Sequence, residues 1–150
     1  MSGDEPADLL LVTDAPLDPA AYFARCTVPR CGALAAFIGT VRSPNRGHEI
    51  EHLVYEAYRP MVTSEMAGLA RQARDRWELG PVAIVHRVGR LLPGEASIAI
   101  VVAAPHRASA LAACAFLIDT AKVVLPVWKK EVTTTGAHWV EGVATAGPTL

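Results

Sequence analysis

Apolar residues along this chain fall into two patterns, short continuous runs and longer stretches with helical spacing. The runs predict five strands, the first of them at a sheet edge, over Leu9–Val12, Ala33–Val41, Ile50–Tyr58, Val82–Val88 and Ala96–Ala104. Two further short strands, Val127–Val132 and His138–Val140, are predicted around the turn formers of Thr133–Gly136. The turns at Ser43–Gly47 and Leu92–Glu95 predict that the second run pairs with the third, and the fourth with the fifth, in antiparallel fashion.

Three segments carry the marks of helices. Asp18 and Pro19 supply an N-cap and a first-turn proline for a helix from about Pro19 to Cys26. A second helix opens at Pro60 and ends before Gly80, and its apolar stripe consists of Val62, Met66, Leu69, Ala70, Ala73 and Trp77. A third, rich in alanine and leucine, runs from about Arg107 to Lys122, and Pro126 stops it. Together these elements predict an α+β fold, with helices packed on a mostly antiparallel, twisted sheet.

Length and composition predict one compact domain. We expect a single domain over residues 1–150, with frayed ends at 1–6 and 144–150. Hydrophobic residues make up 51% of the chain and charged residues 19%, which excludes general disorder. No apolar run approaches the roughly 18 residues of a membrane helix, and the start is acidic where a signal peptide is basic. A cytoplasmic protein without a membrane partner is therefore expected.

Charge and cysteine content exclude further classes. Fourteen Lys and Arg against fifteen Asp and Glu give a net charge of −1, which does not favour nucleic acid as a partner. Cys26, Cys31 and Cys114 have no Cys-x-x-Cys spacing, so we expect buried free thiols. Neither a metal nor a cofactor is predicted.

The stretch His48-Glu49-Ile50-Glu51-His52 matches the His-Glu-x-x-His pattern of zinc peptidases. That pattern binds zinc only on a helix, which brings both imidazoles to one face. Here a turn precedes the motif and strand formers follow it, and on a strand the two histidines would stand roughly 13 Å apart. We therefore interpret the motif as a chance match.

Two lysines around a proline are the most informative feature of the sequence. Lys122 ends the third predicted helix, Pro126 forces the chain to turn, and Lys129 follows in the next strand. One interpretation is structural, since a lysine suits a helix C-terminus and charged residues protect strand edges. The other is a site, in which neighbouring cations and burial depress the pKa of one lysine and make it a nucleophile or proton donor. The spacing alone leaves both open.

Other cations precede this pair. His106 and Arg107 sit where a strand gives way to a helix, a position at which backbone N–H groups and the helix dipole favour a bound anion. Arg42 ends the strand predicted over residues 33–41. Taken alone, these residues are better explained by ordinary roles, as solvated arginines and a histidine that caps the turn.

Ordered blocks of the sequence resemble the large catalytic subunit of molybdopterin synthase. The resemblance spans roughly Gly32 to Glu141 and rests on Gly39-Thr40-Val41-Arg42, His86-Arg87-Val88-Gly89, Pro93-Gly94-Glu95, His106-Arg107 and Lys122-x-x-x-Pro126-x-Trp128-Lys129-Lys130-Glu131. It implies an α/β-hammerhead fold and a sulfurtransferase that converts cyclic pyranopterin monophosphate into molybdopterin. It also implies two kinds of protein partner: a small ubiquitin-like subunit that carries sulfur as a C-terminal Gly-Gly thiocarboxylate, and a second copy of this chain.

The resemblance also implies roles for individual residues. Lys122 and Lys129 match catalytic lysines, with Lys122 closest to the chemistry. The matching positions around the substrate are Thr40, Val41, Arg42, His106, Arg107, Lys122, Lys129, Lys130 and Glu131. A cationic pocket suits this reaction, because the substrate phosphate, the thiocarboxylate and a developing oxyanion are all negative. The C-terminus lacks Gly-Gly, so we expect this chain to receive sulfur from a separate carrier.

A different function remains open. The chain could be a phosphate- or pterin-binding module that keeps the anion pocket without turnover, although the presence of both lysines disfavours that interpretation.

Overall fold

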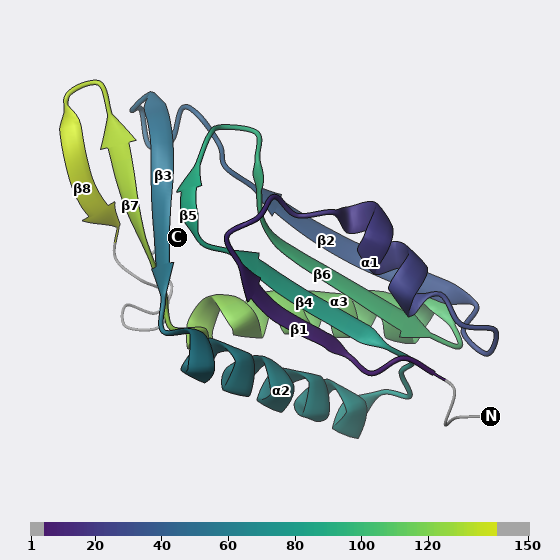
Figure 1. Cartoon of the computed structure of the whole chain (residues 1–150). Coiled ribbons are helices and arrows are strands. Elements are labelled where there is room, and N and C mark those ends of the chain that lie inside the picture. The colour runs from purple at the N-terminus through teal and green to yellow at the C-terminus, as the bar shows by residue number, and fades with distance from the viewer. Residues whose placement is uncertain (1–4, 141–150) are drawn as a thin grey trace.

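The computed structural model describes residues 5–140, which form two four-stranded sheets and three helices. This arrangement confirms the α+β class (Figure 1). In chain order the elements are β1 (Leu9–Thr13), α1 (Pro19–Cys26), β2 (Ala33–Thr40), β3 (Ile50–Ala57), α2 (Arg59–Arg76), β4 (Val82–Arg87), β5 (Gly89–Leu91), β6 (Ala96–Ala104), α3 (Arg107–Val124), β7 (Val127–Thr133) and β8 (Gly136–Val140).

The first sheet has the strand order β1-β4-β6-β2, and both of its faces are covered. β1 runs parallel to β4, whereas the β4–β6 and β6–β2 pairs are antiparallel. Alternate residues of β6 face opposite layers: Ile98, Ile100 and Val102 join the core under α2 and α3, and Ala99 and Val101 pack toward α1. Burial on both faces explains why β6 is apolar without interruption.

α3 covers one face of this sheet with a continuous stripe of small and branched residues. The buried positions recur every three or four residues, as an amphipathic helix requires, and are Ala110, Ala113, Cys114, Leu117, Ile118 and Ala121. α2 lies beside it on the same face, while α1 covers the opposite face (Figure 1). Because α3 begins directly after β6 and doubles back along it, the end of α3 returns to the end of the sheet at which β6 begins.

The second sheet, with the order β5-β3-β7-β8, stands at that end of the first (Figure 1). The hairpin predicted between residues 33–41 and 50–58 is therefore wrong, because β2 pairs with β6 and β3 pairs with β5 and β7. β6 is buried on both faces and needs a partner along each edge, so β4 and β2 both align with it. The segment 41–49 then carries the chain from one sheet to the other.

The remaining predictions concern the β4–β6 pairing, the cysteines, the chain ends and membrane-spanning helices. The antiparallel pairing of β4 and β6 is confirmed, but the short strand β5 between them was missed; it leaves the first sheet to pair with β3. Cys26 and Cys114 are buried free thiols and Cys31 is half-buried. Of the ends predicted to be frayed, 1–4 and 144–150 lie outside the described residues, and Glu5 forms an ion pair with Arg30. Within 5–140 no helix is long and apolar enough to cross a membrane.

Leu117 tests the packing of α3 on the sheet. Its side chain is fully buried, so replacing it with alanine removes apolar contacts and leaves a cavity. We expect Leu117→Ala to lower the free energy of unfolding by ~2–5 kcal/mol, measured by chemical denaturation. The same change at Leu92, which is 46% exposed in a turn, is the matched control and should cost less than ~1 kcal/mol. Equal costs at both positions would contradict the packing described here.

Candidate active site

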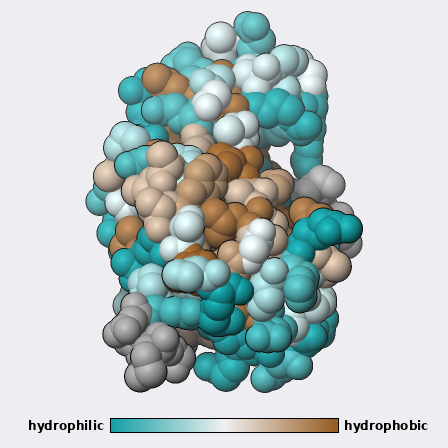
Figure 2. All heavy atoms as spheres, turned by 90° about the vertical axis from the view of Figure 1, so that its right-hand side faces the viewer, coloured by the Kyte–Doolittle hydropathy of each residue, from teal (hydrophilic) through white to brown (hydrophobic). Residues whose placement is uncertain are grey.

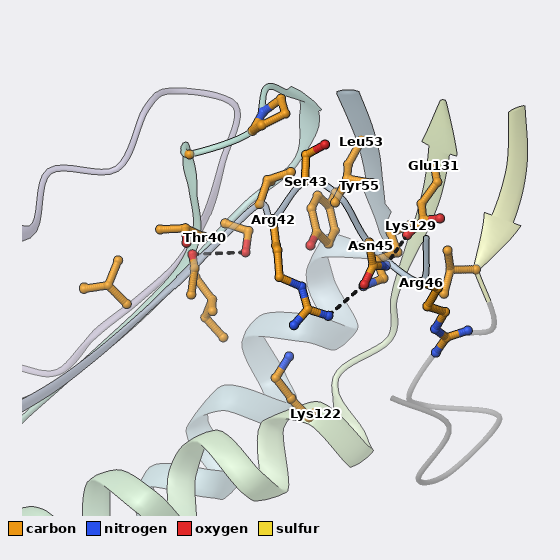
Figure 3. A pocket seen from close by; sticks show the side chains of 18 of the residues that line it. Thr40, Arg42, Ser43, Asn45, Arg46, Leu53, Tyr55, Lys122, Lys129 and Glu131 are labelled. Carbon is orange, nitrogen blue, oxygen red and sulfur yellow. Dashed lines mark hydrogen bonds between the residues drawn. The ribbon is translucent and has the colours of Figure 1, made fainter. Parts of the chain in front are cut away.

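A cavity of about 640 Å³ opens between the two sheets, beside the end of α3. Its walls come from the end of β2, the segment 41–49, β3, the turn before β6, α3 and β7. Figure 3 shows side chains from these separate elements pointing into a common space. The site therefore exists only where the first and second sheets meet.

Lys122 enters the cavity from the last turn of α3. The helix ends two residues later, at Val124, because Pro126 cannot continue it; Leu125 is the C-cap and its N–H still donates to the Ala121 carbonyl at 3.0 Å. In Figure 3 the Lys122 side chain extends from α3 toward the guanidinium group of Arg42. The end of the helix thus places an exposed lysine at the cavity.

β7 supplies the second lysine and an acid. Side chains alternate along a strand, so Lys129 and Glu131 face the cavity while Lys130 points to the other face of the sheet. There the Lys130 ammonium lies 5.3 Å from the centre of the Trp139 ring, a cation–π contact. The structure therefore does not bring Lys130 into the cavity of its own chain.

The segment 41–49 forms the rim and contributes Arg42, Ser43, Asn45 and Arg46. A tight turn holds it: the N–H of Asn45 donates to the His48 carbonyl at 2.8 Å, and that of His48 donates back at 3.0 Å. Arg46 and Gly47 sit between them at φ 52° and 80°, a left-handed pair that suits a turn of this kind. The zinc-peptidase motif is thereby divided between this turn and β3, so the strand context predicted for His52 is confirmed.

The turn at 92–95 faces this segment across the cavity mouth. Arg87 pairs with Glu95, with 3.3 Å between Nη1 and Oε2, and the Leu92 N–H donates to the same carboxylate at 2.7 Å. Gly94 adopts φ 90°, which a side chain would disfavour. Two backbone hydrogen bonds, at 2.8 and 2.9 Å, then tie Gly94 and Glu95 to Val41. The His-Arg and Pro-Gly-Glu blocks of the sequence thus hold the cavity rim in place.

A buried histidine lies behind the lysines. The Nδ1 of His86 is 2.8 Å from the Arg87 carbonyl, and because a carbonyl can only accept, Nδ1 carries the hydrogen. The His86 ring meets the Tyr55 ring edge-on, with 5.3 Å between centroids. Burial, assisted by the nearby charge of Lys122, lowers the pKa of His86 to about 4. His86 is therefore neutral near pH 7 and adds no charge to the site.

Lys129 has an unusual environment for an ammonium group. Its pKa lies below the ordinary lysine value, first because burial disfavours the charged form and then because Lys122, Arg46 and Arg42 are also cationic. The negative charge of Glu131 partly opposes this shift by raising the pKa of Lys129. Four basic residues and one carboxylate thus line a cavity in a chain whose net charge is −1. Such a site suits an anionic ligand and contains an amine that gives up its proton more readily than usual.

Six of the residues predicted around a substrate line this one cavity: Thr40, Val41, Arg42, Lys122, Lys129 and Glu131. His106 and Arg107 do not, because they lie at the start of α3 while Lys122 lies at its end. At 1.5 Å per residue, the helix separates Arg107 from Lys122 by about 22 Å. Within one chain they cannot hold the same small ligand.

Sequence analysis missed other residues of the cavity, notably Asn45, Arg46, Tyr55 and Ser97. The pattern of residues 43–47 predicts a turn, and the signal for a site there is that its polar side chains directly follow Arg42. Tyr55 and Ser97 carried no such signal, because each looks like an ordinary strand residue until the two sheets are brought together.

Comparison with known proteins now identifies the family. Residues 12–124 match the family described as MoaE protein. A molybdopterin synthase catalytic subunit from Arabidopsis thaliana is 42% identical over 83% of this chain and 63% of its own length. A molybdopterin synthase catalytic subunit 1 from Mycobacterium tuberculosis is 40% identical over 86% of this chain and 88% of its own.

The fold agrees with this assignment. The crystal structure of molybdopterin synthase from Staphylococcus aureus superposes with a TM-score of 0.84 and 31% identity, covering 87% of this chain and 95% of that one. Sequence and fold lead to the same conclusion: the chain belongs to the MoaE protein family.

Proposed function

We propose that this chain is the catalytic subunit of a molybdopterin synthase. In this function it transfers sulfur from the thiocarboxylated C-terminus of a small ubiquitin-like subunit to cyclic pyranopterin monophosphate, forming the dithiolene of molybdopterin. One observation carries the proposal: in a member of the MoaE family, four basic side chains from α3, β7 and the segment 41–49 surround one cavity.

The charge of the cavity suits each species in the reaction. The substrate phosphate, the thiocarboxylate and the oxyanion that develops on its carbonyl are all negative, so fixed cations stabilise binding and transition state alike. Arg42 and Arg46 at the rim suit the phosphate, because a guanidinium can donate two parallel hydrogen bonds to it. The carrier tail ends in two glycines, whose lack of side chains suits entry between the rim and the end of α3.

The two lysines have different environments, which favours different roles. The depressed pKa of Lys129 makes its amine the better base or nucleophile. Lys122, exposed at the end of α3, supplies positive charge to the reacting atoms and helps to lower the pKa of Lys129. This division reverses the order of importance that the sequence resemblance suggests.

A second copy of the chain would complete the site. β2 is an edge strand of the first sheet, and its eight residues include no charged side chain that would discourage pairing. Leu34 on β2 is 43% exposed and Leu111 on α3 is 63% exposed. Figure 2, which views the side where α1 and β2 lie in Figure 1, shows apolar surface gathered in the middle of that side. We therefore infer that two copies pair through their β2 edges.

In such a pair, His106 and Arg107 of one copy would lie near the cavity of the other copy. When two β2 strands pair antiparallel about a two-fold axis, the start of β2 in one copy meets the end of β2 in the other. The start of β2 aligns with Ala104, just before His106 and Arg107, and the end of β2 lines the cavity. His106 and Arg107 of the second copy would then reach the cavity that Lys122 and Lys129 line in the first.

Sulfur transfer itself tests the proposed function. With thiocarboxylated small subunit and cyclic pyranopterin monophosphate, we expect the wild type to form molybdopterin and Lys122→Ala, which loses a stabilising charge, to be slower by roughly 10²–10³-fold. Arg71→Ala, which removes an exposed cation from α2, is the matched control and should retain activity. Equal rates for Lys122→Ala and the wild type would contradict the role of this lysine. No product from any variant would favour a binding module.

The pKa of Lys129 can be measured directly. The chain has only three lysines, so the isotope-labelled side chains can be followed by NMR during a pH titration. Lys122→Met removes a repelling charge and should raise the pKa of Lys129, whereas Glu131→Gln removes an attracting charge and should lower it. The pH dependence of kcat/KM should move the same way in each variant. A shift of the same sign in both variants would contradict the electrostatic account.

Mixed dimers test whether two copies share a site. We expect Arg107→Ala and Lys122→Ala to be nearly inactive alone. When they are unfolded and refolded together, half of the dimers are mixed, and each mixed dimer has one site with both residues intact. About a quarter of the wild-type activity should therefore return. Mixed dimers that form without recovering activity would place both residues in the same chain's site.

A further inference from the structure

The side-chain amide of Asn45 bridges two oppositely charged residues of the cavity. Its Oδ1 accepts a hydrogen bond from Nη2 of Arg42 at 2.7 Å, and its Nδ2 donates to Oε2 of Glu131 at 2.6 Å. Figure 3 shows both bonds, which lead from the rim of the cavity to β7. The amide orientation follows from its neighbours, because a guanidinium only donates and a carboxylate only accepts.

The backbone around Asn45 is held independently of this side chain. Its N–H and carbonyl form the reciprocal pair with His48 described above, and the Ile50 N–H donates to the Ser43 hydroxyl at 2.9 Å. The side chain is therefore not needed to close the turn. One of its hydrogen bonds joins it to the side chain of Arg42 in the same segment, the other joins it to Glu131 on β7, and both partners line the cavity.

Glu131 is a carboxylate that would be expected to pair with a cation. Only 4% of the residue is exposed, and its Oε1 lies 3.3 Å from Nε2 of His138. Among the described residues, Arg42 has no carboxylate oxygen within ion-pair distance, although Glu131 is only one amide away. Asn45 occupies the space through which the two charges would otherwise meet.

We propose that Asn45 is a positioning residue that orients Arg42 toward the anionic group of the substrate and keeps Glu131 from neutralising it. The inference rests on the proposed function for the identity of that anion, but not for the hydrogen-bond bridge. A neutral amide suits this role because it can accept a hydrogen bond from a cation and donate another to an anion at the same time, without adding charge. An aspartate of nearly the same size would pair with Arg42 and repel Glu131.

A double-mutant cycle tests the coupling between Asn45 and Arg42. In the complex with thiocarboxylated small subunit, Asn45→Ala should raise the KM for cyclic pyranopterin monophosphate about tenfold and lower kcat less than about threefold. In the Arg42→Ala background the same change should raise KM less than about twofold, because the group that Asn45 orients is gone. Asn45→Asp should raise KM more than Asn45→Ala does. Glu49→Ala, an exposed change in the same segment, should leave KM unaltered.

The outcomes separate positioning from a structural role. A general loosening of the segment would raise KM equally in the wild-type and Arg42→Ala backgrounds, and that result would overturn the proposal. So would an Asn45→Asp variant with the KM of the wild type. Thermal unfolding of each variant identifies any that fail to fold.

A second measurement needs neither substrate nor turnover. The chain contains one asparagine, Asn45, and one glutamine, Gln72, so its side-chain amide NH₂ groups give only two pairs of NMR signals. Arg42→Ala and Glu131→Ala should each shift the Asn45 pair and leave the Gln72 pair in place. If the enzyme assay fails for the wild type while these shifts appear, the proposed function is wrong and the bridge stands. An Asn45 pair that responds to neither change overturns the bridge itself.

Discussion

The packing of α3 against β6 and β2 is the contact on which the rest of the structure depends. It buries a stripe from Ala110 to Ala121 against a strand that is itself buried on both faces. Each large apolar side chain buried in this way contributes about 1.5–3 kcal/mol, so the position of the helix is strongly determined. Because α3 doubles back along β6, this contact also decides where Lys122 lies: at the end of the first sheet, where the second sheet begins.

Gathering cations at one place has a cost that the surrounding structure offsets. Lys122, Lys129, Arg42 and Arg46 line the same cavity, and their mutual repulsion is part of what lowers the pKa of Lys129. Glu131 relieves some of this repulsion, but it reaches Arg42 only through an amide. The cavity therefore retains a strong positive field while its side chains remain ordered, which is what the binding of a charged substrate requires.

Much of the local structure could be predicted from the sequence, because it depends on local signals. The start of α1 follows from the Asp18 cap and Pro19, and the end of α3 follows from Pro126. The pairing of β2 could not be predicted in the same way. Because β3 follows β2 along the chain, the sequence favours pairing between these two strands. In the structure β2 pairs with β6 instead. That pairing is preferred because helices cover both faces of the first sheet and bury β6.

Some residues of the candidate site could likewise be predicted from the sequence, and others could not. Lys122 and Lys129 could be selected from sequence, because charges that flank a helix-breaking proline suggest a site and the surrounding blocks match a family. Sequence by itself thus determined the class of fold, every helix and strand of the described residues except β5, and the lysine pair, which all depend on residue type and spacing. Only the tertiary structure decided that Lys130 faces away from the cavity and that Asn45 links Arg42 to Glu131. Each of these depends on which strands pair and which face they turn inward, and those choices are set by contacts between residues far apart in the chain.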